Sequence, residues 1–128
     1  MKKKIYYAHT MTTYYSQEEA NAVELLESMG YEVVNPSDKK IVEGFELFKR
    51  ANPSKNYMEY FFDVVKTCDL LAFSAADDDK LTSGVVKEVL YALSTRMSVI
   101  EIHTIDSLNP ERFMSLEKTR EYLTKNSH

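Results

Sequence analysis

The sequence predicts an α/β protein, a three-layer sandwich in which helices cover a mostly parallel sheet of four to five strands. Short β-rich runs alternate with helical patterns along the chain, and this order is typical of parallel sheets joined by right-handed crossovers. The run 70–74 lacks polar alternation, as expected for a central strand covered on both faces. With 128 residues, 44% of them hydrophobic, the chain has room for one domain, residues 1–128.

The first predicted strand spans residues 5–8, and a polar loop follows over residues 9–15. A helix then begins at Ser16, because Ser16 and Glu19 have the spacing of a capping box. The apolar residues that follow keep a 3.6-residue period. Gly30 can end this helix in a left-handed conformation.

A second strand over residues 31–34 ends before Pro36, which lacks the amide that a strand needs. A short helix is expected within residues 37–53. The next helix ends near Thr67 and carries apolar side chains on nearly all sides. A helix that is apolar all round has to be buried, and a subunit contact buries it most easily in so small a domain. We therefore expect a homodimer or higher homo-oligomer through helix 57–66.

The third strand, residues 70–74, leads into a loop over residues 75–81. The helix that follows spans residues 83–97 and precedes a fourth strand at residues 98–102. A final helix is predicted over residues 110–125, beginning near a proline.

Charge and composition exclude several classes of function. A formal net charge of −4 argues against binding to a polymeric nucleic acid, whose phosphates attract clustered Lys and Arg. No apolar stretch approaches the roughly 20 residues that cross a bilayer, and no signal peptide is visible, so we expect a cytoplasmic protein without a membrane partner. Cys68 is the one cysteine and is interpreted as buried packing. No residue pattern indicates a metal site or a cofactor.

A ligand site is expected beyond the carboxyl ends of the strands, where open α/β sheets form their crevice. The loops at that edge carry hydroxyls, amides and carboxylates, which suit a sugar or a nucleotide. His9 is a ligand contact or an ordinary hydrogen-bonded side chain, Asn35 a sugar contact or a turn residue, and Tyr14 a base-stacking ring or a packed one. The candidate binding residues are His9, Thr10, Asn35, Asp77, Thr82, Ser83 and Gly84.

The stretch from Thr82 to Glu88 places a polar turn before an apolar helix and one carboxylate on that helix. If Thr82 or Ser83 caps the helix, free amides point into the crevice and favour an anion such as phosphate, and Gly84 lets the anion approach closely. Helical geometry places Glu88 at the border of the apolar stripe. Burial would raise its pKa and the helix N-terminus would lower it, so the sequence leaves its protonation state open. The alternative is an exposed glutamate at the edge of the core.

Several short motifs, in this order, resemble the nucleoside 2-deoxyribosyltransferase superfamily, which includes proteins that hydrolyse nucleoside 5′-monophosphates. The likeness covers most of residues 4–102 and implies a Rossmann-like or flavodoxin-like sandwich. The matching positions are Tyr6, Val65, Asp69, residues 70–73, Thr82, Gly84, Glu88 and Ala92.

The resemblance implies that Glu88 is a nucleophile at C1′ of a nucleoside or nucleotide, and that Tyr6 holds its carboxylate by a hydrogen bond. A hydroxyl at Thr82, where deoxyribosyltransferases often carry Asp, tilts the expectation toward a phosphorylated substrate. The implied partner is therefore a small-molecule nucleoside or nucleotide, and the implied reaction is N-glycosidic bond cleavage or transfer.

Two positions depart from the family pattern. Phe61 stands where the family usually has Asp, which removes a candidate general acid, and Leu90 replaces a common glycine. Asp77 and its two acidic neighbours can substitute only if their loop folds inward; otherwise they are a solvated loop run. The alternative function is a non-catalytic nucleotide-binding or sensing module, including a TIR-like signalling or sequestering role.

Overall fold

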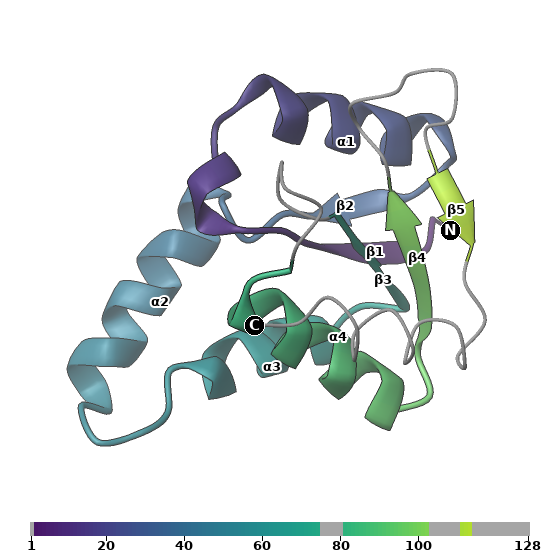
Figure 1. The fold of residues 1–128 in the computed structure, drawn as a ribbon. Coiled ribbons are helices and arrows are strands. Elements are labelled where there is room, and N and C mark those ends of the chain that lie inside the picture. Colours follow the sequence, from purple (N-terminus) through teal and green to yellow (C-terminus); the bar gives the residue numbers. More distant parts are fainter. Residues whose placement is uncertain (1, 75–80, 103–110, 114–128) are drawn as a thin grey trace.

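The structure is a computed structural model that describes residues 2–74, 81–102 and 111–113. Within these residues five strands form one sheet in the order β2-β1-β3-β4-β5 (Figure 1). Its first four strands are parallel, and the last pairs antiparallel. The elements are β1 (Lys4–Ala8), the short 3-10 helix η1 (Met11–Thr13), α1 (Gln17–Ser28), β2 (Glu32–Val34), α2 (Lys39–Ala51), α3 (Met58–Lys66), β3 (Leu70–Phe73), α4 (Ser83–Ser94), β4 (Ser98–Ile102) and β5 (Glu111–Phe113).

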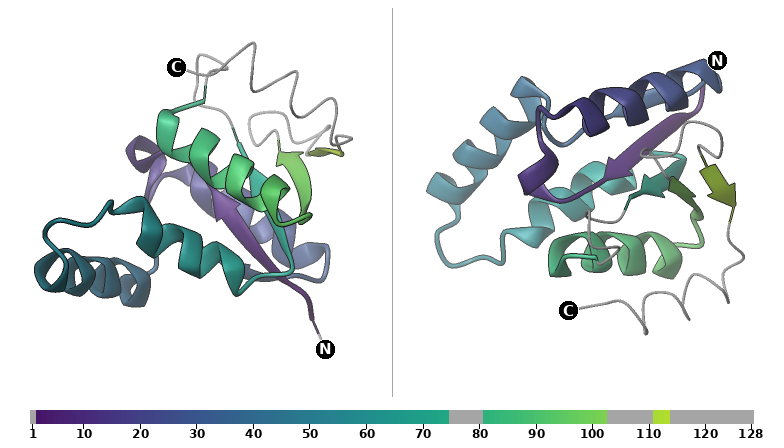
Figure 2. Two further views of the ribbon diagram at one scale, coloured as in Figure 1. Left: turned by 90° about the horizontal axis from the view of Figure 1, so that it is seen from below. Right: turned by 45° about the horizontal axis from the view of Figure 1, so that its top comes forward.

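Alternate residues of β1 serve the two faces of the sheet, because successive side chains of a strand point to opposite sides. Ile5 and Tyr7 pack with α1, whereas Tyr6 and Ala8 pack with α3 and α4. Figure 2 shows α1 on one face and α3 and α4 on the other. The predicted three-layer α/β sandwich with a mostly parallel sheet is confirmed.

The helix α2 covers neither face of the sheet. It lies beyond the carboxyl end of β1 (Figure 1) and packs against α3, where the ring centroid of Phe45 is 4.8 Å from that of Phe61. Gly44 permits this approach, because a Cβ atom there would lie 2.5 Å from the hydroxyl of Tyr60. That hydroxyl donates a hydrogen bond of 2.7 Å to the Ile41 carbonyl. The two helices therefore form one packed unit at the edge where a site is expected.

The helix α3 is not apolar all round. Glu59, Asp63 and Lys66 are exposed, and other parts of the same chain cover its apolar sides. The Phe62 ring stacks on Tyr91 of α4 with centroids 4.6 Å apart. The packing that the sequence assigns to a second subunit is thus supplied in part by α2 and α4.

The predicted helix over residues 110–125 is wrong at residues 111–113, which form β5. This strand pairs with β4, Ile100 opposite Phe113. The open edge of a sheet presents unpaired backbone groups, and pairing with them overrides a local helical pattern. The rest of the predicted helix lies outside the described residues.

Candidate functional site

Glu88 lies on the face of α4 that packs against the sheet. The helix buries Val85, Val89 and Ala92 along the predicted stripe, and Glu88 at its border is only 7% exposed. The alternative of an exposed glutamate is therefore wrong. A carboxyl group in such a place loses most of its hydration, which is unfavourable unless a partner stabilises it.

Tyr6 is the partner of Glu88. It lies in β1 with a completely buried side chain, and its hydroxyl donates a short hydrogen bond to Oε2 of Glu88. Burial raises the pKa of Glu88 to about 8, although the bond from Tyr6 opposes this rise. Burial and the nearby Glu88 in turn raise the pKa of Tyr6 well above its usual value. At neutral pH Glu88 is therefore mostly protonated, and Tyr6 is the hydrogen-bond donor.

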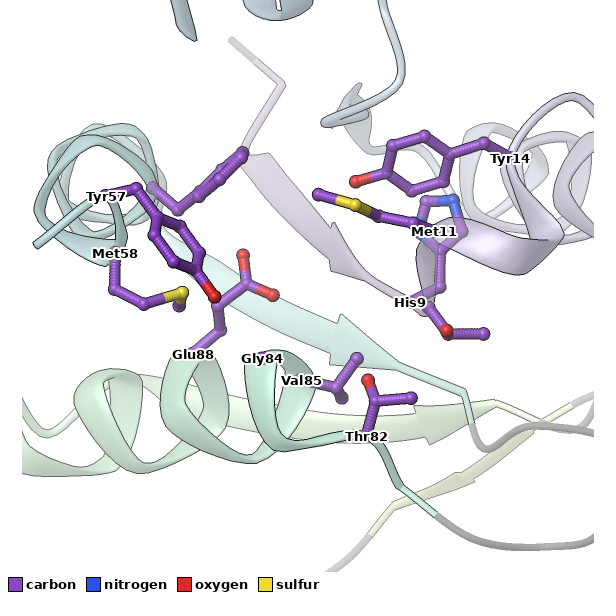
Figure 3. Close-up of a pocket in the computed structure, with 11 residues that line it drawn as sticks. His9, Met11, Tyr14, Tyr57, Met58, Thr82, Gly84, Val85 and Glu88 are labelled. Carbon is purple, nitrogen blue, oxygen red and sulfur yellow. The ribbon is translucent and has the colours of Figure 1, made fainter. Parts of the chain in front are cut away.

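Glu88 opens into a cavity of about 230 Å³. In Figure 3 its carboxyl group reaches up from α4, with Tyr57 and Met58 on one side and His9 and Met11 on the other. The wall combines aromatic rings, two thioethers and two threonine hydroxyls. The lining residues are His9, Thr10, Met11, Tyr14, Tyr57, Met58, Phe61, Thr82, Gly84, Val85 and Glu88.

His9 forms a fixed part of this wall. Its Nδ1 lies 2.9 Å from the carbonyl oxygen of Tyr7, and its Nε2 lies 2.7 Å from Oε2 of Glu19. The ring stacks on Tyr7, with centroids 4.1 Å apart, and meets the tilted ring of Tyr14. A carbonyl oxygen can only accept, so Nδ1 carries a proton and donates it. Both ring nitrogens are engaged within the protein, so His9 shapes the cavity without a free donor for a ligand.

Glu19 is the buried partner of His9, and the sequence indicates it only as part of a helix cap. Its amide donates to Oγ of Ser16 at 3.1 Å, as the capping box predicts. Its Oε1 accepts from the amide of Tyr15 at 3.1 Å, one residue earlier than the predicted partner. Burial alone would raise the pKa of Glu19, but hydrogen bonds, first of all that from His9, hold it below its usual value. Glu19 is thus a carboxylate that pairs with Nε2 of His9.

Glu19→Gln is expected to lower the free energy of unfolding by about 1–3 kcal/mol at pH 7, because a buried charged hydrogen bond is weakened. The folded pKa of Glu19 is lowered, so its stabilisation is present above the unfolded pKa and is lost as the pH falls through the folded value. Urea unfolding at several pH values should show the difference from wild type shrinking in acid. Glu24→Gln, at an exposed position of α1, is the control. A pH-independent difference would contradict the assignment.

The structure brings some of the predicted binding residues together and separates others. His9, Thr10, Thr82 and Gly84 line the cavity with Glu88. Thr82 is the N-cap residue of α4, and its carbonyl oxygen accepts a hydrogen bond from the amide of Val86 at 3.0 Å. The hydroxyl of Thr82 does not cap the helix.

Asn35 and Ser83 do not reach the cavity. Oδ1 of Asn35 accepts from the amide and the hydroxyl of Ser37, both at 3.1 Å, which is the turn geometry of an asparagine before a proline. Ser83 is exposed at the start of α4. Asp77 lies outside the described residues.

The aromatic and sulfur side of the cavity is the part that sequence reasoning missed. The sequence pattern indicates Tyr57, Met58 and Val85 only as packing residues and Phe61 only as a departure from a family pattern, and it gives no sign of Met11. Tyr57 and Phe61 are four residues apart, a spacing that places both on one face of a helix. That spacing was the available signal, but only the packing of α3 beside α4 turns this face toward Glu88.

The chain matches no model of a known protein family, and a search of curated proteins finds no match. In the described part of the chain, no three His, Cys, Asp or Glu residues are grouped so as to hold a metal ion. No helix among the described residues is long and apolar enough to cross a membrane. The function is therefore inferred from the residues of the site.

Proposed function

We propose that this protein cleaves or transfers the N-glycosidic bond of a nucleoside or nucleoside 5′-monophosphate, with Glu88 as the nucleophile at C1′. One observation carries the proposal: a buried carboxyl group, bonded to the buried Tyr6, opens into a small cavity. Carboxyl groups that are buried beside a cavity are common at positions where they act on a substrate. A purely structural glutamate would be more stable at the surface.

The reaction requires the ionised form of Glu88. Its carboxylate attacks C1′ while the bond from C1′ to the base nitrogen breaks, and the electron pair leaves with the base, which takes a proton from water. Water then hydrolyses the glycosyl ester, or a second base takes the sugar. The hydrogen bond from Tyr6 fixes the carboxylate and disperses its charge.

The lining of the cavity suits both the phosphate and the base of a nucleotide. Thr82 and Gly84 lie at the first turn of α4, where free amides and the helix dipole favour a phosphate group. Tyr14 and Tyr57 offer rings on which a base can stack. Burial raises the pKa of Tyr14, so its hydroxyl stays protonated as a neutral donor.

The rate of base release is expected to rise with pH, because the reaction requires the ionised form of the buried Glu88. Because the pKa of Glu88 is about 8, the rate should rise about tenfold per pH unit below this value and level off above it. The assay follows released base from nucleosides, deoxynucleoside 5′-monophosphates and NAD between pH 5 and 9.5. Glu88→Gln should abolish release, and Glu59→Gln, an exposed position of α3, should not. A rate that is flat or falls with pH would contradict this role of Glu88.

A second candidate function is a non-catalytic nucleotide-binding or sensing module. Two features favour it: burial raises the pKa of Glu88 to about 8, and Phe61 lines the cavity where the resemblance leads one to expect an acid. A neutral glutamic acid can bind a ligand as a hydrogen-bond donor. Tight binding without base release in the same assay would favour the module.

We also propose that the protein is a cytoplasmic homodimer with a contact that includes the helix 57–66. Tyr57, at the start of α3, is 52% exposed and stands beside the cavity, and Met11 nearby is 59% exposed. Neighbouring exposed apolar side chains that together form a contiguous patch are typical of contact surfaces. Light scattering of the purified chain tests the dimer.

A further inference from the structure

A second cavity of about 580 Å³ adjoins the Glu88 cavity. It lies between α2, α3 and the segment around η1. Met11, Tyr14, Tyr57 and Phe61 line both cavities, so the two spaces meet at these residues. The proposed reaction uses only the smaller space.

The second cavity is largely apolar. Val42 and Phe45 of α2 line it together with the residues that it shares with the Glu88 cavity. The charged lining residues among those described are Glu46 and Lys49, which pair with each other at 3.1 Å. Lys49 also lies over the Phe45 ring, 4.6 Å from its centroid. Lys49 is the one positively charged residue among the described lining residues, and it is already paired with Glu46. The second cavity therefore does not suit the pyrophosphate of a dinucleotide.

Tyr15 lines the second cavity and is held in place. Its φ of 65° lies in the left-handed region, which is unfavourable for a bulky residue. Two bonds hold it there: its hydroxyl donates to the Ser37 carbonyl at 2.9 Å, and its amide donates to Glu19 at 3.1 Å. The wall is therefore built into the fold, independently of any ligand.

The geometry of glycosyl transfer relates the two cavities. A nucleophile and the base that it displaces lie on opposite sides of C1′. With the sugar at Glu88, the base extends away from α4 toward Met11 and Tyr14, which Figure 3 shows across the cavity from Glu88 and which also line the second cavity. A group attached to the outer edge of the base would enter the second cavity.

We propose that the preferred substrate is a nucleotide whose base carries an apolar substituent, and that this substituent occupies the second cavity. This inference rests on the proposed function, because it uses the placement of the sugar at Glu88. An unmodified base is too small to fill both spaces and would leave the apolar walls of the larger one in contact with water. Each methylene buried there should tighten binding about fourfold.

The test separates binding from cleavage. The probes are deoxyadenosine and deoxycytidine 5′-monophosphates with hydrogen, methyl, pentyl or benzyl on the exocyclic amine. Calorimetry with Glu88→Gln gives the dissociation constants, and chromatography of wild-type reactions gives base release. Val42→Phe fills the second cavity. Leu47→Phe adds the same ring at a position of α2 that is 65% exposed and outside the lining.

The pentyl or benzyl nucleotides should bind at least tenfold more tightly than the unsubstituted ones. Val42→Phe should remove this gain and Leu47→Phe should keep it. Equal dissociation constants across the series in Glu88→Gln, or a gain that survives the addition of Val42→Phe to Glu88→Gln, would overturn the inference. Release of unmodified bases would then leave the proposed function standing. Graded binding without release would instead uphold the second cavity and overturn cleavage by Glu88.

Discussion

Replacing Glu88 by glutamine is expected to abolish base release and at the same time to stabilise the protein. The folded state holds the Glu88 proton up to a pH of about 8, whereas the unfolded chain releases it near 4.5. Between these values the folded state binds more protons, so the free energy of unfolding falls as the pH rises. The full span corresponds to a loss on the order of 5 kcal/mol. Glutamine does not ionise, so the free energy of unfolding of Glu88→Gln does not fall with pH for this reason.

Urea unfolding between pH 5 and pH 9 measures the effect. Glu88→Gln should exceed wild type by about 2–4 kcal/mol at pH 9 and should approach it at pH 5, because part of the gain is offset by an amide group that needs a partner. Glu27→Gln, at an exposed position of α1, should leave the pH dependence of wild type unchanged. An unchanged dependence in Glu88→Gln would show that Glu88 ionises normally. Such a trade of stability for activity is common at catalytic positions.

Tyr6→Phe is expected to have the second-largest effect. The change removes the hydroxyl that donates to Glu88 and leaves a buried carboxyl group in an apolar surrounding. Since this bond opposes the rise caused by burial, its loss should raise the pKa of Glu88 further. The rate of base release at pH 7 should fall about ten- to a hundredfold, and the midpoint of the pH profile should move upward.

The matched control is Tyr7→Phe. Tyr7 is the next residue of β1 and is equally buried, but it lies on the other face of the sheet, and its hydroxyl bonds with Oγ of Ser74 at 2.7 Å. This variant should lose stability without a shift of the midpoint. If both variants lost activity equally with unshifted midpoints, Tyr6 would be a packing residue and not a positioning residue for Glu88.

Local patterns in the sequence were sufficient to predict most of the fold. The capping box at Ser16, the apolar run of β3 and the short β-rich run of β1 each reflect a composition or a motif that a few neighbouring residues define. The edge strand β5 could not be predicted in this way. Glu111–Phe113 is a strand because it pairs with β4. This pairing depends on the tertiary fold, which the local sequence does not reveal.

The same division holds within the site. The stripe around Val85 and Ala92 was enough to place Glu88 near the core, but the balance between burial and the helix dipole depends on what covers the carboxyl group. The partnership of Glu19 with His9 required the fold of the loop between them. The side of the cavity formed by Tyr57 and Phe61 depended on how α3 and α4 pack together.

The central claim is that the Glu88 carboxylate forms a bond to C1′. A deoxynucleoside 5′-monophosphate with fluorine at C2′ should slow the second step more than the first and trap the glycosyl ester, which intact mass and peptide mapping can detect. The expected result is one equivalent of released base and one sugar phosphate on the peptide that contains Glu88. Continued base release with no adduct, or an adduct on another peptide, would contradict this mechanism.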